Sequence, residues 1–217
     1  GFAFRFQFGT KEGRETLLKL YRHEAEAALS AGIQPFAYKL FNEADFRDFS
    51  PVNAWKFKEK MRKKYSTIER LNAAWHTNFP AFDKVEWSKA GTAGRVEYAK
   101  YLEDLAAGFF AEARAMLRKL DPGALTFGQV HSSAYLANWN NFNLYKINRN
   151  MDFISTGTGN FTFSQGEQIN PDQPIAEHFT PNAELRKLLG RGAFILALAD
   201  RKPIVTTEAY FDGMGDR

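Results

Sequence analysis

The chain has 217 residues, of which 44% are hydrophobic and 15% aromatic, enough for one domain with a substantial core. The formal net charge is only +4, and the basic residues are scattered, so we expect no nucleic-acid partner. The lack of cysteine excludes disulfides, thiolate metal ligands and cysteine nucleophiles. No apolar run approaches the roughly 18 residues of a membrane helix, so we expect no membrane partner.

The first part of the chain alternates between strand and helix patterns. Phenylalanine at every second position predicts a strand over Gly1–Phe8. Helical spacing of apolar residues follows over Lys11–Ala31, and the apolar run Pro35–Phe41 predicts a buried strand. A second amphipathic helix is predicted over Pro51–Lys64, with its proline in the first turn.

The middle of the chain contains the best-patterned helix. Residues Tyr65–Gly94 are mixed and aromatic, and no regular element is predicted there. The helix predicted over Arg95–Leu120 should pack one apolar face, including Phe109, against the sheet. Asp121-Pro122-Gly123 should end this helix.

The last part of the chain returns to short strands and helices. In order, the predicted elements are strand Leu125–Val130, helix Leu144–Asn148, strand Met151–Ser155, loop Thr156–Pro174, helix Asn182–Asp200 and strand Pro203–Thr207.

This alternation, repeated about five times, predicts an α/β fold of βα units around a parallel sheet. A complete (β/α)8 TIM barrel needs about 250 residues, so residues 1–217 suit one partial barrel domain of about five units. We expect the barrel to lack at least its first two strands and its last, in a piece of a longer protein. Exposed edges at Gly1–Phe8 and Pro203–Thr207 would then make the piece poorly soluble alone.

Two glutamates stand at predicted strand ends. Asn42 and Glu43 follow the strand that ends at Phe41, and Glu208 follows the strand that ends at Thr207. A single such Glu is commonly just solvated, and an Asn there can simply form a turn. Two carboxylates beside core strands incur a desolvation cost that suggests a use, and a pair about 5–5.5 Å apart is what retaining glycoside hydrolysis requires.

These strand ends resemble those of the clan A glycoside hydrolases, which are (β/α)8 retaining enzymes. The stretch FKEKMRKKYSTIERLNAAWHTNF, Phe57–Phe79, is similar to the segment after the acid/base in family 42 β-galactosidases. The match lies mainly in the run Leu71–Trp75 at the correct offset. Ser66 and His76 replace two glycines of that family, and Pro80 stands where it usually has a sugar-lining tryptophan. The family's cysteine cluster is absent, so the resemblance indicates the clan more strongly than the substrate.

The resemblance implies a retaining β-glycosidase that acts on a carbohydrate, either a β-galactoside-like substrate or another β-glycoside. Glu43 would be the acid/base, Glu208 the nucleophile, and Asn42 would bind the sugar 2-hydroxyl. No cofactor is implied. A catalytically silent carbohydrate-binding barrel is the alternative, although both intact glutamates favour an enzyme. A barrel enzyme for another substrate would need a phosphate site, a Schiff-base lysine or a metal cluster at its strand ends, and the sequence shows none.

Other polar residues near strand ends are candidates for substrate binding. They are Gln129, His131, Asn160 in the Gly-Thr-Gly-Asn loop, and Tyr210. His131 is equally compatible with a structural role. The four histidines have no metal-ligand spacing, so we expect no metal. Trp139, within an asparagine-rich stretch, could form a sugar-binding wall or simply pack its own loop, and Trp75 should be a packing residue.

Overall fold

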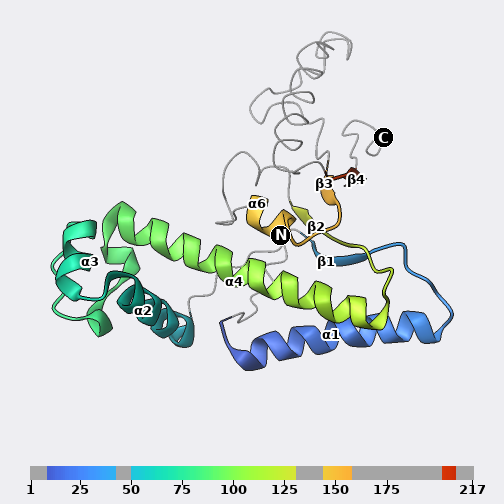
Figure 1. The fold of residues 1–217 in the computed structure, drawn as a ribbon, viewed down its shortest axis with the longest axis horizontal. Coiled ribbons are helices and arrows are strands. Elements are labelled where there is room, and N and C mark those ends of the chain that lie inside the picture. Colours follow the sequence, from blue (N-terminus) through green and yellow to red (C-terminus); the bar gives the residue numbers. More distant parts are fainter. Residues whose placement is uncertain (1–8, 43–49, 131–143, 158–201, 209–217) are drawn as a thin grey trace, which may run out of the picture.

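The computed structural model describes residues 9–42, 50–130, 144–157 and 202–208 (Figure 1). The helices are α1 (Lys11–Ser30), α2 (Pro51–Tyr65), α3 (Ile68–Trp75), α4 (Gly91–Leu120) and α6 (Leu144–Asn148). Two short 3-10 turns, η1 (Phe82–Lys84) and η2 (Trp87–Lys89), lie between α3 and α4. The strands are β1 (Tyr38–Asn42), β2 (Thr126–Val130), β3 (Ile154–Gly157) and β4 (Ile204–Glu208).

The four strands form one sheet in the order β1-β2-β3-β4, and all pairs are parallel. The sequence order of the strands is therefore also their spatial order, as expected when each crossover returns the chain to the next position in a βα fold. All four carboxyl ends consequently lie at one edge of the sheet. The predicted α/β class with a parallel sheet is confirmed for the described residues.

The first hydrophobic core lies between the sheet and the helices α1 and α4, which run side by side (Figure 1). Leu40 and Phe41 of β1 pack with Phe109 and Phe110 of α4, and the Phe41 and Phe110 rings are 4.9 Å apart. A Cβ atom at Gly128 would lie 2.0 Å from the Phe41 ring, so only glycine fits in β2 there. We call β1–β4, α1, α6 and residues 106–120 of α4 the sheet region.

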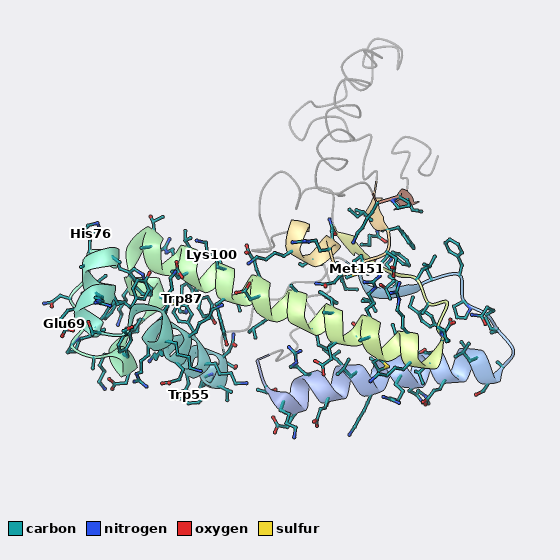
Figure 2. All side chains as sticks on the ribbon, viewed as in Figure 1. Trp55, Glu69, His76, Trp87, Lys100 and Met151 are labelled. Carbon is teal, nitrogen blue, oxygen red and sulfur yellow. The ribbon has the colours of Figure 1, made fainter. Side chains whose placement is uncertain are left out.

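Among the described residues, the second core contains no strand. Phe57, Met61, Leu71, Trp75 and Tyr98 are buried among α2, α3 and the start of α4. Trp87 lies in this part of the molecule, whereas Met151 lies beside the sheet, at the other end of α4 (Figure 2). We call α2, α3, η1, η2 and residues 91–102 of α4 the helical end.

Polar contacts fix how these helices begin and how they meet the strands. The hydroxyls of Thr10, Ser50 and Thr67 accept hydrogen bonds from backbone N–H groups of α1, α2 and α3, which satisfies donors that a helix start leaves open. The Tyr21 hydroxyl of α1 donates to the Leu40 carbonyl of β1. Burial raises the pKa of Tyr21 to about 12, so this phenol stays protonated and keeps donating.

The structure confirms the register of the longest helix and corrects its start. Phe109 is fully buried in the core beside the sheet, as predicted. Tyr98 and Leu102 are buried on the same face of the helix but pack in the second core, so only the later part of the predicted face lies against the sheet. The helix begins at Gly91 rather than Arg95. Gly91 has a φ of 58°, which gives a sharp turn into the helix that the apolar periodicity could not reveal.

Helix α3 was missed inside the segment predicted to be irregular. It has only eight residues, too few for a clear period, but Thr67 caps its start and Leu71 and Trp75 bury one face of it. The expected packing role of Trp75 is confirmed, because its side chain is 4% exposed.

All four described strands begin later than predicted, by one residue in β2 and β4 and by three in β1 and β3. β1 begins at Tyr38 rather than Pro35, and Phe36 before it is 79% exposed. β3 begins at Ile154 rather than Met151, because the N–H groups of Asn150 and Met151 bond back to α6 and close its last turn. The strand predicted over 1–8, the helix predicted over 182–200 and most of the loop predicted over 156–174 lie outside the described residues.

Candidate functional site at the strand ends

The described residues include three of the seven predicted site residues. Asn42 is the last residue of β1 and is exposed, Gln129 lies in β2 and is fully buried, and Glu208 is the last residue of β4. The other four lie outside the described residues: Glu43, His131, Asn160 and Tyr210.

The strand register brings Asn42 and Gln129 together. Asn42 pairs with Gln129, and Gln129 pairs with Ser155 of β3. Ser155 in turn pairs with Val205 of β4. Paired positions of a parallel sheet share a face, so this row runs across one face of the sheet, near its carboxyl edge.

Register shifts occur where β1 and β4 pair with their neighbours, and both shifts precede the predicted site residues. In β1 the shift falls between Lys39 and Phe41, and it aligns Asn42 with Gln129. Between β3 and β4 a second shift aligns Glu208 with Gly157, two residues after Ser155. Because side chains alternate along a strand, one extra residue moves the following positions to the other face. The shift in β1 thus brings position 42 into the face that Gln129 and Ser155 share.

A lysine holds the buried amide of this row. The Lys39 ammonium donates to the Gln129 side-chain oxygen over 2.6 Å. The Phe127 ring of β2 stacks on Phe153 next to β3, with ring centroids 4.8 Å apart. Lys39 pairs with Phe127 in the sheet, so an aromatic layer lies below the polar row. Lys39 was not among the residues predicted for the site, although a lysine within an apolar strand is unusual enough to indicate a buried partner.

Lys202 fixes the start of β4. Its ammonium donates to the carbonyl oxygens of Asn148 (2.6 Å), Arg149 (3.0 Å) and Met151 (2.5 Å). These oxygens lie at the end of α6, where a helix leaves acceptors open and its dipole favours a cation. This contact sets the position of the strand that ends at Glu208, and the sequence pattern gave no sign of it.

Asp152 joins the amino-terminal side of the sheet to α4. It accepts hydrogen bonds from the guanidinium groups of Arg114 and Arg118, and from the N–H and hydroxyl of Thr126 at the start of β2. Burial opposes its ionisation, but the hydrogen bonds from Arg114 and Thr126 outweigh burial and lower the pKa of Asp152. The carboxylate is therefore charged at neutral pH and holds β2 and β3 in register.

The described residues contain no group of three or more His, Asp or Glu side chains that could hold a metal ion. In the same residues, none of the helices has the length and apolar character needed to cross a membrane.

Comparison with known families identifies the chain. The profile of glycoside hydrolase family 42, described as beta-galactosidase, matches residues 25–198. The chain belongs to glycoside hydrolase family 42. Glu43 lies within the matched range, and Glu208 lies beyond it. No curated protein matches this family 42 chain significantly in sequence.

Solved structures give the fold of the family 42 chain. A beta-galactosidase from Bacillus circulans sp. alkalophilus aligns with 84% of this chain and 27% of its own, at 18% identity and a TM-score of 0.56. A beta-galactosidase from the psychrophilic Marinomonas ef1 aligns with 70% and 24%, at 18% identity and a TM-score of 0.54. The agarase AgWH50C aligns with 94% and 28%, at 18% identity and a TM-score of 0.59.

These likenesses show a fold of the TIM-barrel type. The family 42 chain spans about a quarter of the length of the structures it resembles.

The stretch that resembled family 42 has a structural role in the helical end. Asn72 donates to the carbonyl oxygen of Phe79 and accepts from the Phe79 N–H and the Thr77 hydroxyl, at 2.8–2.9 Å. The Asn72 side-chain amide thus satisfies both backbone hydrogen-bonding groups of Phe79 and fixes the loop that follows α3. Leu71 and Trp75 on either side of it fill the core, and the Trp75 indole donates to the Tyr65 hydroxyl.

The two residues that stand where the family has glycine, Ser66 and His76, lie where the backbone conformation favours glycine. Among the described residues, Ser66 and His76 are the non-glycine residues with positive φ, at 66° and 54°. His76 adopts the left-handed conformation that ends α3. Ser66 is the centre of a three-residue turn in which the Thr67 N–H bonds to the Tyr65 carbonyl oxygen, a positive-φ γ-turn that is strained for a residue with a Cβ.

Proposed function

We propose that this chain is the central part of a retaining β-glycosidase that acts on a β-galactoside-like substrate. Glu43 is the acid/base and Glu208 the nucleophile. Membership of family 42 supports a glycoside hydrolase with a carbohydrate substrate. The observation that carries the residue assignment is the sheet: β4 ends at Glu208, β1 ends just before Glu43, and the two strands run parallel with β2 and β3 between them.

That spacing fits the fourth and seventh strands of a (β/α)8 barrel, with the fifth and sixth between them. Adjacent strands lie about 4.8 Å apart, so a flat sheet would separate the ends of β1 and β4 by roughly 14 Å. Two glutamates on such a sheet would also project in parallel and could not converge. Closure of the barrel turns the inner faces toward one another, which can bring the carboxyl groups to the roughly 5–5.5 Å of a retaining pair.

The chemistry assigns a different task to each group. Glu43 must carry a proton to protonate the leaving oxygen, while ionised Glu208 attacks the anomeric carbon and forms a glycosyl-enzyme ester. Glu43 then removes a proton from the water that hydrolyses this ester. Asn42 holds the sugar 2-hydroxyl. Gln129, beside Asn42 in the sheet and held by Lys39, lies below the sugar and supports this contact.

The assignment can be tested by chemical rescue in the full-length polypeptide. Glu208→Ala should abolish hydrolysis of aryl β-galactosides, and azide should restore turnover with an inverted glycosyl azide as product. Glu43→Ala should spare substrates with good leaving groups, and azide should then give the retained product. Rescue of neither variant, in proteins that melt like the wild type, would overturn the assignment.

The agarase alignment supports a second choice of substrate, because it covers 94% of this chain. Hydrolysis of agarose oligosaccharides but not of aryl β-galactosides would indicate that the enzyme acts on a polysaccharide. Pro80, where family 42 usually has a sugar-lining tryptophan, is consistent with a changed sugar pocket.

A further inference from the structure

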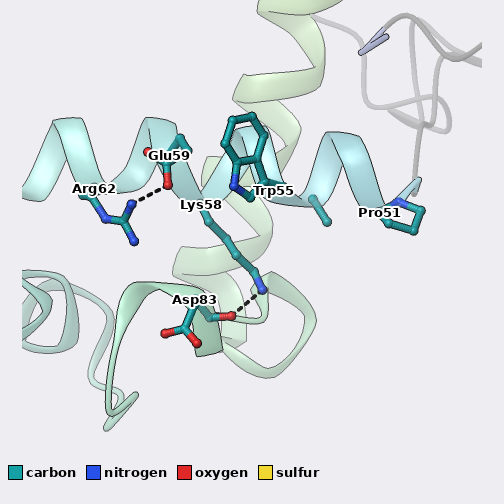
Figure 3. A pocket seen from close by; sticks show the side chains of 7 residues that line it. Pro51, Trp55, Lys58, Glu59, Arg62 and Asp83 are labelled. Carbon is teal, nitrogen blue, oxygen red and sulfur yellow. Dashed lines mark hydrogen bonds and ion pairs between the residues drawn. The ribbon is translucent and has the colours of Figure 1, made fainter.

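A groove lies along α2 in the helical end (Figure 3), and α2 lies apart from the strands (Figure 1). Its volume is about 420 Å³, within the roughly 300–1,000 Å³ of small-ligand sites. The lining residues are Pro51, Ala54, Trp55, Lys58, Glu59, Arg62 and Asp83.

Trp55 provides an open aromatic face in this groove. It is 60% exposed, and no ring from the described residues stacks on it. Two other tryptophans of the helical end are packed: Trp75 is 4% exposed, and Trp87 stacks on Tyr98 with ring centroids 4.5 Å apart. Because the ring is exposed and does not stack on another ring among the described residues, its face is open to solvent. This indole is therefore available to a ligand.

The polar groups around Trp55 are held in place. The Lys58 ammonium reaches across the groove and donates to the Asp83 carbonyl oxygen over 2.6 Å, which joins α2 to η1 (Figure 3). Arg62 pairs with Glu59 over 2.5 Å, and its guanidinium lies 5.5 Å from the centre of the Phe82 ring. Lys58 retains two ammonium hydrogens, and Glu59 a second carboxylate oxygen, with no partner among the described residues.

The charges of the groove favour a neutral ligand. Lys58 and Arg62 line the groove together with Glu59 and Asp83; Arg62 pairs with Glu59, and Asp83 pairs with Lys84 beside the groove. An anion or a cation would therefore meet a like charge within the groove. Hydrogen-bond donors and acceptors line the same groove as the indole. A pyranose ring has this complementary character, since its C–H face is apolar and its hydroxyls both donate and accept.

We propose that this groove is a secondary carbohydrate-binding site, where a pyranose ring of an oligosaccharide stacks on Trp55. Its hydroxyls bind Lys58, Glu59 and Asp83. Such a site would hold a polymeric substrate on the surface while the strand ends act on another part of it. The choice of galactose-containing probes rests on the proposed function, whereas the stacking geometry does not.

Calorimetric titration with agarose-derived and β-1,4-linked galactose tetrasaccharides tests the site. The Glu208→Ala background prevents consumption of the sugar. Trp55→Ala should weaken binding about tenfold or more, and Trp55→Phe should weaken it less. The matched control is Val52→Ala, because Val52 is also exposed on α2, at 45%, and it should bind like its parent.

Unchanged affinity in Trp55→Ala, or no binding of either sugar to the parent, would overturn the proposal. Sedimentation velocity tests the alternative occupant of the groove, a second copy of this chain, by measuring the oligomeric state. An oligomer that Trp55→Ala converts to monomer would assign the groove to a second copy of the chain instead. If the proposed function is wrong, the wild-type protein should show no glycoside hydrolysis, but sugar binding should still depend on Trp55. The two failures are therefore distinguishable.

Discussion

The sheet region and the helical end differ in what they contribute. The helical end contains the stretch most like family 42, yet Leu71, Asn72 and Trp75 there pack a core and hold a loop. The sheet region has few recognisable residues, but its strands end at the positions proposed for catalysis. The stretch most similar to family 42 and the residues proposed for catalysis thus lie in different parts of the molecule. A sequence match to the helical end alone says little about activity.

The largest expected effect tests whether the two regions are stable independently. Phe109 in the sheet region and Phe57 in the helical end are both buried to 1% exposure or less. Replacing either with alanine should lower the free energy of unfolding by about 3–5 kcal/mol, because each change leaves a cavity. Denaturation followed by circular dichroism should show a single transition in both variants. The control is Val96→Ala on the exposed side of α4. Two separated transitions would contradict a shared fold.

Asn72→Ala in the helical end should lower the free energy of unfolding without lowering kcat. The change removes three hydrogen bonds, each contributing roughly 0.5–1.5 kcal/mol, so we expect a loss of about 2–3 kcal/mol. In the full-length polypeptide at a temperature where the variant is folded, kcat should stay close to wild type. The matched control is Asn78→Ala in the same loop. A large fall in kcat with normal stability would mean that the helical end takes part in the chemistry.

Asp152→Asn should weaken the sheet region in a pH-dependent way. At pH 7 the loss should be about 1–3 kcal/mol, because two arginines and Thr126 lose a charged acceptor. The pKa of Asp152 is lowered by folding, so the unfolded state binds more protons in acid. Its contribution is present above the unfolded pKa of about 3.9 and lost as pH falls toward the folded pKa.

Urea denaturation from pH 7 to pH 3 can check this dependence. The gap between wild type and Asp152→Asn should narrow below about pH 4. Glu24→Gln, on the exposed side of α1, should leave the profile unchanged. A gap that stays constant down to pH 3 would contradict a role for the charge.

The smallest predicted effect is a gain in stability from a substitution in the helical end. Ser66→Gly should raise the free energy of unfolding by about 0.5–1 kcal/mol, because relief of the positive-φ strain outweighs the extra entropy of glycine in the unfolded chain. His76→Gly should act in the same direction. Ser66→Ala, which keeps a Cβ, should give no gain, and thermal melts of the three variants would show the order.

Particular residues show which parts of this structure were predictable. The helix around Phe109 and the parallel order of the strands were evident, because apolar periodicity and βα alternation act over many residues. The register shifts at Phe41 and Glu208 were not, since an extra residue in a strand depends on its neighbour rather than on its own sequence. Lys39, Lys202 and Asp152 were missed for a related reason: their partners are distant along the chain.

Helix α4 belongs to both regions and has a kinetic consequence. Its 30 residues extend about 45 Å at 1.5 Å per residue, and the two cores divide it between Leu102 and Ala106. At this division Asp104 accepts from Lys60 of α2 and from Lys146 of α6. Native-state hydrogen exchange should therefore find equally slow amide protons in the buried turns around Tyr98 and around Phe109, because one helix joins the two cores into a cooperative unit.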